Sequence, residues 1–201
     1  MADLGAQAMG FAATATVVSD ESESLILVNA NDEPTGFASK GECHDGDGIL
    51  HRAFSLFLFN DSGQLLLQQR SEHKRLWPLF WSNSCCSHPR RGESIEIATE
   101  RRLQQELGMG GQFQFLYKFE YQARYGELGS EHELCSVFVG RSTDPVQANA
   151  TEIAAWRYVG ASELDAEMAD RPDRFTPWFK MEWQRLKLEY SDQLRQLGCE
   201  I

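Results

Sequence analysis

The chain has 201 residues, of which 42% are hydrophobic and 11% aromatic, enough for one well-filled core and too little for two full domains. Its net charge of −11 argues against nucleic acid and anionic membrane surfaces as primary partners. It has an odd number of cysteines, no signal-peptide pattern and no apolar stretch of about 18 residues. We therefore expect a cytoplasmic protein with reduced thiols. We also expect a monomer.

The first 23 residues show no clear hydrophobic periodicity, so we expect a flexible extension over 1–23 followed by one domain over 24–201. Apolar or alternating runs bounded by turn residues predict the strands of that domain, and the glycine-rich, polar segment 41–48 predicts a loop. The predicted strands cover residues 24–29, 37–40, 51–60, 64–70, 113–121, 131–140 and 153–159.

Three helices are expected in addition to these strands, the first of them between the predicted strands 64–70 and 113–121. The first begins near Glu93 and ends at Gly108, the second opens at Ser162, and the third has Thr176 as its N-cap. Strands dominate the first two-thirds of the chain and helices its end. This order predicts an α+β fold.

Positive charge is concentrated in one part of this acidic chain. Residues 70–102 contain the seven cations Arg70, Lys74, Arg75, Arg90, Arg91, Arg101 and Arg102, against the four acids Glu72, Glu93, Glu96 and Glu100. A locally positive patch in a strongly acidic protein indicates a small anionic ligand.

A second group of residues has the side chains of a metal site, namely His44, His51, His88, Glu131 and Glu133. Imidazole and carboxylate ligands together suit Mn²⁺, Mg²⁺ or Zn²⁺, and the two glutamates fall on the same side of one predicted strand. The alternative is that the histidines are ordinary loop and strand residues and the glutamates a solvated face. A zinc site made of Cys43, His44, Cys86 and His88 is a weaker possibility.

Cys86 lies between the basic segment and the start of the predicted helix. Surrounding positive charge would lower the pKa of its thiol and make it a usable acid, base or nucleophile. The alternative is a buried structural cysteine, which is the commonest fate of a free thiol.

The predicted helix over 93–108 resembles the Nudix box, with which enzymes hold Mg²⁺ against a diphosphate and activate water. The matching positions are Glu93, Arg101, Leu103, Glu106, Gly108 and Met109. The chain departs from the box at Arg102 and Gln105, where the box has glutamates. Arg102 can bind a diphosphate directly, so the pattern implies that diphosphate binding is kept and diphosphate hydrolysis is lost.

Three patterns occur together: the motif W-S-N-S-x-C-x-H-P around Cys86, the seven-residue spacing of His44 and His51, and Glu131-x-Glu133 after an aromatic strand. Together they resemble type I isopentenyl-diphosphate isomerases, a family with the Nudix fold. The resemblance covers residues 25–180. It implies an α/β/α sandwich, with a mixed β-sheet core flanked by helices, that isomerises isopentenyl diphosphate to dimethylallyl diphosphate by protonation and deprotonation.

The resemblance also implies a role for each matching residue. The catalytic residues would be Cys86, Glu133 and Tyr121, with the thiol and the carboxylate on opposite faces of the alkene. The substrate contacts would be Lys40, Arg70, Lys74 and Arg102 on the diphosphate and Trp178 on the hydrocarbon end. One divalent ion, Mn²⁺, Mg²⁺ or Zn²⁺, would be held by His44, His51, His88, Glu131 and Glu133, and Glu106 would hold a Mg²⁺ that arrives with the substrate.

Two other functions remain open from the residues alone. A Nudix pyrophosphohydrolase is the runner-up, although the missing glutamates at positions 102 and 105 count against it. A zinc-stabilised binding domain is the third, non-catalytic possibility. We favour the isomerase, with a small prenyl diphosphate as its substrate and no nucleic-acid or membrane partner.

Overall fold

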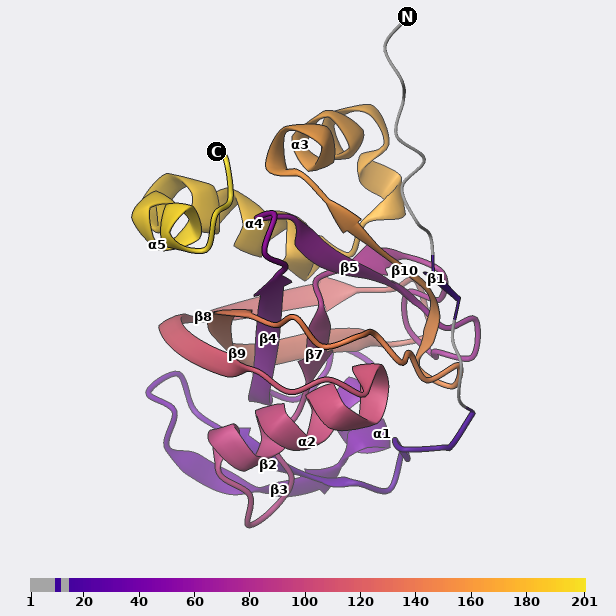
Figure 1. Ribbon diagram of the computed structural model, residues 1–201. Helices are drawn as coiled ribbons and strands as arrows, with labels where there is room; N and C mark the ends of the chain where they lie inside the picture. The colour runs from indigo at the N-terminus through magenta and orange to yellow at the C-terminus, as the bar shows by residue number, and fades with distance from the viewer. Residues whose placement is uncertain (1–9, 12–14) are drawn as a thin grey trace, which may run out of the picture.

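Figure 1 shows the computed structural model, in which residues 10–11 and 15–201 are described, as a twisted β-sheet with helices on both faces. The longest continuous apolar run forms β4 (His51–Phe59), whose residues are almost all buried, as expected for a strand covered on both faces. It pairs in parallel with β9 (Ser130–Arg141) and antiparallel with β7 (Cys85–Ser87). These three strands carry His51, Cys86, Glu131 and Glu133 of the site described below.

The remaining strands extend the sheet on either side of this centre. β9 pairs antiparallel with the aromatic strand β8 (Gln112–Arg124), and β4 touches β5 and β2 at its two ends. The other strands are β1 (Gly10–Phe11), β2 (Ser24–Val28), β3 (Pro34–Ser39), β5 (Leu65–Arg70), β6 (Trp81–Ser82) and β10 (Ile153–Val159). Every strand predicted from the sequence is present, with ends shifted by the pairing of its neighbours.

Helices cover the two faces of the sheet and create two cores. On one face, α2 (Ile95–Leu107) packs Leu103 and Leu107 against β4; its N-cap is Ser94 and its C-cap is Gly108 in the left-handed conformation. On the other face lie α3, α4 and α5 (Figure 1), with Trp183 in the core. Their bounds are Ala161–Asp170, Pro177–Glu189 and Ser191–Gln196, and a 3₁₀ turn spans Pro172–Arg174. The expected α/β/α sandwich of the α+β class is confirmed.

One predicted loop is wrong in part. The segment 41–48 was expected to be a loop, but Lys40–His44 forms the short helix α1. The Ser39 side chain accepts a hydrogen bond from the backbone N–H of Glu42, and the Glu42 carboxylate accepts one from the backbone N–H of Ser39. This capping box offsets the poor helix propensity of a glycine-containing segment. It directs His44 into the protein interior.

The described parts of the expected N-terminal extension, residues 10–11 and 15–23, contact the domain, the first of them by pairing as β1 with β10. Lys40 donates a backbone hydrogen bond to Glu23, and Asn149 donates from its side chain to the carbonyl of Thr16. The flexibility expected over 1–23 stays a prediction, since part of that range lies outside the described residues. Across the described residues, no helix combines the length and apolar character needed to cross a membrane.

Candidate active site and metal centre

Strand register brings distant side chains to one face of the sheet. Glu133 on β9 lies opposite His51 on β4 and, on its other side, opposite Tyr121 on β8. Ser55, four residues after His51, lies opposite Cys86 on β7. Because residues two apart in a strand share a face, Cys86 and Glu133 belong to the same side of the sheet.

Five buried side chains converge beside this face. Potential ligand atoms of His44, His51, His88, Glu131 and Glu133 all lie within 4.8 Å of one another. His44 Nε2 lies 2.7 Å from Glu131, and Glu133 Oε1 lies 2.8 Å from His88 Nε2 and 3.8 Å from His51 Nε2. The ligand group predicted from the sequence is therefore assembled.

Backbone contacts orient two of these imidazoles for a metal ion. Nδ1 of His44 lies 2.6 Å from the carbonyl oxygen of Lys40, and Nδ1 of His51 lies 2.7 Å from that of Ile49. A carbonyl oxygen only accepts, so each Nδ1 carries a hydrogen, and in the neutral form of each ring Nε2 has the lone pair that a metal ion at the centre of the cluster would use. Nε2 of His51 is buried and has no hydrogen-bond partner among the described residues. This donor set fits a divalent cation.

Without an ion, burial and the charges of neighbouring residues shift the pKa values of the cluster residues in different directions. Burial and the neighbouring Glu131 raise the pKa of Glu133 to about 7. Burial and nearby His44 lower the pKa of His88 well below its ordinary value. Burial would also lower the pKa of His44, but Glu131 outweighs it and raises that pKa to about 9. A divalent ion would relieve this conflict, because it favours ionised carboxylates and neutral imidazoles together.

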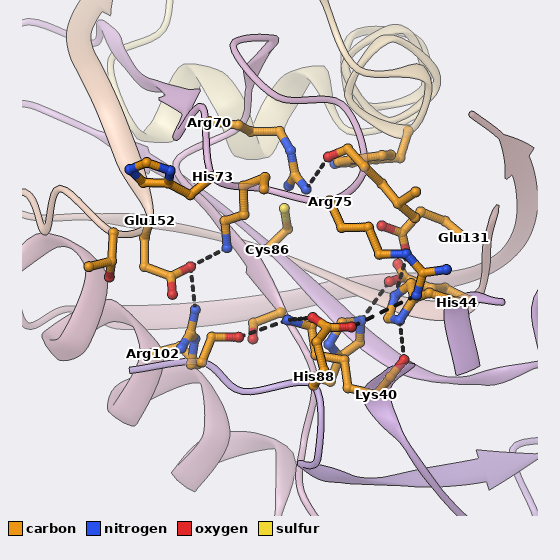
Figure 2. Close-up of a pocket in the computed structure, with 18 of the residues that line it drawn as sticks. Lys40, His44, Arg70, His73, Arg75, Cys86, His88, Arg102, Glu131 and Glu152 are labelled. Carbon is orange, nitrogen blue, oxygen red and sulfur yellow. Dashed lines mark hydrogen bonds and ion pairs between the residues drawn. The ribbon is translucent and has the colours of Figure 1, made fainter. Parts of the chain in front are cut away.

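A cavity of about 420 Å³ opens beside the cluster (Figure 2). Residues from well-separated parts of the chain line it, including Lys40, Arg70, Lys74, Cys86, Arg102, Tyr121, Glu133 and Trp178. The predicted catalytic and substrate-binding residues therefore share one cavity. His51 and Glu106 are not among its lining residues; His51 belongs to the ligand cluster, and Glu106 contacts Arg102.

The thiol and the carboxylate in this cavity have high proton affinities. The hydroxyl of Tyr121 donates to Glu133 Oε2 at 2.6 Å. Burial raises the pKa of the half-buried Cys86 thiol to about 12, more than the nearby Arg70 lowers it. The lowered thiol pKa considered from the sequence is wrong, because desolvation outweighs the basic segment. Cys86 is therefore protonated at neutral pH and able to act as an acid.

The cations at the other end of the cavity already have protein partners. Lys40 Nζ lies 2.8 Å from Ser19 Oγ and 3.1 Å from Glu21. Arg70 donates to two loop carbonyls, and its guanidinium carbon lies 5.3 Å from the centre of the Trp178 ring. These contacts hold both cationic side chains at the cavity wall.

Lys74 and Arg102 share a further partner that sequence analysis missed. Glu152, 3% exposed, contacts Lys74 and lies 3.1 Å from Arg102, which also binds Glu106. Burial would raise the pKa of Glu152, but Lys74 and Arg102 outweigh it and lower that pKa to about 2. No local pattern marked this residue, since it is a single acid before strand β10.

Comparison with known proteins decides the family. Residues 49–179 match the NUDIX domain model. Isopentenyl-diphosphate Delta-isomerase 1 of Photorhabdus laumondii is 40% identical over 86% of this chain and 99% of its own length. The Delta-isomerases of Burkholderia multivorans (42% identical, 78% and 89% covered) and Schizosaccharomyces pombe (37%, 79% and 79%) are also similar. The chain belongs to the isopentenyl-diphosphate Delta-isomerase family.

Solved structures support the fold of this isomerase family member. A crystal structure from Deinococcus radiodurans superposes with a TM-score of 0.61 at 23% identity, covering 74% of this chain and 90% of that one. A MutT protein from Methanosarcina mazei gives 0.57 at 18% identity, covering 70% and 95%. At such identities the likeness concerns the fold alone.

The geometry also bears on the zinc alternative for this isomerase family member. Among the described residues, the group able to hold a metal contains His44 and His88 but neither Cys43 nor Cys86. The four-residue Cys/His zinc site is therefore not supported.

Proposed function

We propose that this protein converts isopentenyl diphosphate to dimethylallyl diphosphate, a step that supplies isoprenoid biosynthesis. One observation carries the proposal most directly: Cys86 and the Tyr121-bound Glu133 line one cavity, and cationic side chains line the same cavity. The reaction adds a proton at one carbon and removes another two carbons away. It therefore needs two acid–base groups facing one short hydrocarbon, with an anchor for its charged end.

Cys86 and Glu133 are proposed as the catalytic pair, and Tyr121 as the hydrogen-bond donor that assists Glu133. One of the pair gives its proton to the alkene while the other accepts the proton that leaves. The raised pKa of the Cys86 thiol keeps a proton available at neutral pH. An unactivated alkene is a weak base, so a proton donor in a desolvated site suits this chemistry.

The hydrocarbon end is proposed to lie against Trp178. This ring is 2% exposed and packs edge-on against Trp77, with ring centres 5.2 Å apart. Aromatic walls exclude water that would capture a carbocation, and the π face of an indole attracts positive charge. The Trp178 ring would thus protect the intermediate and stabilise its charge, while Trp77 packs against that ring.

The diphosphate is proposed to bind at the cationic end, through Lys40, Arg70, Lys74 and Arg102. Guanidinium groups match phosphate oxygens in pairs, and lysines act as mobile point charges. Glu106 would contact the Mg²⁺ that accompanies the diphosphate as part of the substrate. Its neighbour Arg102 holds the carboxylate in place, with Nε 2.9 Å from Glu106 Oε1.

The His/Glu cluster is proposed to hold a resident divalent ion through His44, His51, His88, Glu131 and Glu133. Its mixed nitrogen and oxygen donors suit Mn²⁺ or Mg²⁺, with Zn²⁺ as a further option. Such an ion would supply positive charge that sets the orientation and proton affinity of Glu133. We further infer a monomer acting in the cytoplasm on this small-molecule substrate.

The test is turnover of isopentenyl diphosphate by purified protein supplied with Mg²⁺ and Mn²⁺. Formation of dimethylallyl diphosphate without phosphate release is the expected result. Phosphate release from prenyl or nucleoside diphosphates, without isomerisation, would instead identify a Nudix hydrolase.

A further inference from the structure

Glu152 occupies an unusual place for a carboxylate, inside the cationic end of the cavity (Figure 2). Its Oε2 forms ion pairs with Lys74 and Arg102, two of the residues proposed to bind diphosphate. A negative charge at this position repels a negatively charged ligand. Its presence therefore requires an explanation beyond simple anion binding.

The backbone around Glu152 holds this carboxylate in a defined position. Glu152 donates its N–H to the carbonyl of Asn149 at 3.0 Å, and its own carbonyl accepts from the N–H of Ser71 at 2.9 Å. Asn149 in turn donates to the carbonyl of Glu106 at 2.8 Å, near the end of α2. The carboxylate is thus tied to the helix that carries Arg102 and to the loop that carries Lys74.

Buried charges balance at this end of the cavity. Arg102 is 2% exposed and lies between two carboxylates, Glu106 and Glu152, while Lys74 shares Glu152. Two cations therefore face two buried carboxylates. A free diphosphate entering here would bring several negative charges close to two buried carboxylates that already compensate Lys74 and Arg102, which is unfavourable.

A diphosphate that carries a divalent cation has a much smaller net charge. The cation can face the carboxylates while the phosphate oxygens face Lys74 and Arg102. Without the Glu152 charge, the same cations would attract the free anion as well. The charge at position 152 therefore discriminates between the two forms of the ligand.

We infer that Glu152 is a specificity-determining residue, which makes the site accept diphosphate as its divalent-cation complex and reject free diphosphate. This inference rests on the proposed function, because it takes Lys74 and Arg102 as diphosphate contacts. Glu152 also positions both cations, but an ion pair of purely structural value would not change the cation dependence of binding.

The test is calorimetric titration of the full-length protein with inorganic pyrophosphate, with and without Mg²⁺. For the unmodified protein we expect Mg²⁺ to tighten binding at least about tenfold. Glu152→Gln should lower this ratio severalfold, by strengthening metal-free binding, while Glu106 still favours the Mg²⁺ complex. Glu93→Gln is the matched control and should keep the full ratio. It breaks a partly buried ion pair with Arg101, the neighbour of Arg102 on α2, but Glu93 does not line the cavity.

A second variant keeps the inference testable if Glu152→Gln does not fold. Lys74→Gln removes the more exposed partner and leaves Glu152 less compensated, so the ratio should rise. An unchanged ratio in a folded Glu152→Gln protein, or a lower ratio in Lys74→Gln, would overturn the inference while leaving the isomerase proposal intact. Absence of pyrophosphate binding in either form by the unmodified protein would overturn the proposed diphosphate site itself.

Discussion

Tyr121 donates a hydrogen bond of 2.6 Å to one oxygen of Glu133, while the other oxygen of that carboxylate lies 2.8 Å from His88. Glu133 therefore faces the cavity with one oxygen and the ligand cluster with the other. Its proton affinity depends on both neighbours, because a hydrogen bond to the anion lowers it and desolvation raises it. The acid–base group and the proposed metal ion are thus coupled through a single carboxylate.

Tyr121→Phe should reduce kcat about 100-fold, in the usual range for loss of an assisting acid–base group, with little change in KM. The ring remains to pack against Trp178, so the variant should fold and keep its metal content. Steady-state kinetics and metal analysis of the purified variant test this. An unchanged kcat would exclude the hydroxyl from proton transfer.

Cys86→Ser should lower turnover at least about 1000-fold, since a serine hydroxyl is a much weaker acid than a thiol. The variant should remain folded and metal-loaded, because Cys86 is outside the ligand cluster. Circular dichroism, metal analysis and turnover are measured on the same preparation. Unfolding or metal loss in this variant would instead favour a structural zinc site.

Glu106→Gln should raise KM for isopentenyl diphosphate about tenfold or more, since it removes the proposed contact to the substrate's Mg²⁺. Metal bound at the His/Glu cluster should stay unchanged. Glu100→Gln, exposed on the same helix, is the matched control and should behave as the unmodified protein. Loss of the cluster-bound ion in Glu106→Gln would refute two separate metal positions.

Glu182 makes stability depend on pH, because burial raises the pKa of this carboxyl to about 8 from 4.5. A raised carboxyl pKa means that its stabilising contribution is complete below pH 4.5 and is lost as pH rises through 8. The free energy of unfolding of Glu182→Gln minus that of the unmodified protein should therefore increase by roughly 2 to 3 kcal/mol when the pH is raised from 5 to 7.

Urea denaturation of both proteins at the two pH values measures this difference. Glu189→Gln, at an exposed position of the same helix, should show no such gain. An equal stability difference at pH 5 and pH 7 would mean that Glu182 is ionised in the folded protein over this whole range.

Local sequence signals predicted the elements whose patterns were long or strongly marked. The alternating aromatics of β8 and the capped helix ending at Gly108 formed as expected, and the five residues that the resemblance implies as metal ligands lie close together. The helix at Lys40–His44 was missed because it is only five residues long and depends on a capping box. Periodicity carries little information over so short a segment.

Tertiary contacts decided what sequence patterns did not. The pKa of Cys86 depends on burial more than on the basic residues near it in sequence, so its direction was misjudged. Glu152 lies 50 residues from Arg102 along the chain, and nothing around it marks a binding residue. Only the folded arrangement of helix α2 and the segment before β10 places these two charges together.

The most direct test of the proposed isomerase follows isopentenyl diphosphate by NMR in D₂O with purified protein, Mg²⁺ and Mn²⁺. Signals of dimethylallyl diphosphate should appear with deuterium incorporated at the carbon that receives the proton, and Cys86→Ser should abolish both changes. An unchanged spectrum from folded, metal-loaded protein would contradict the account.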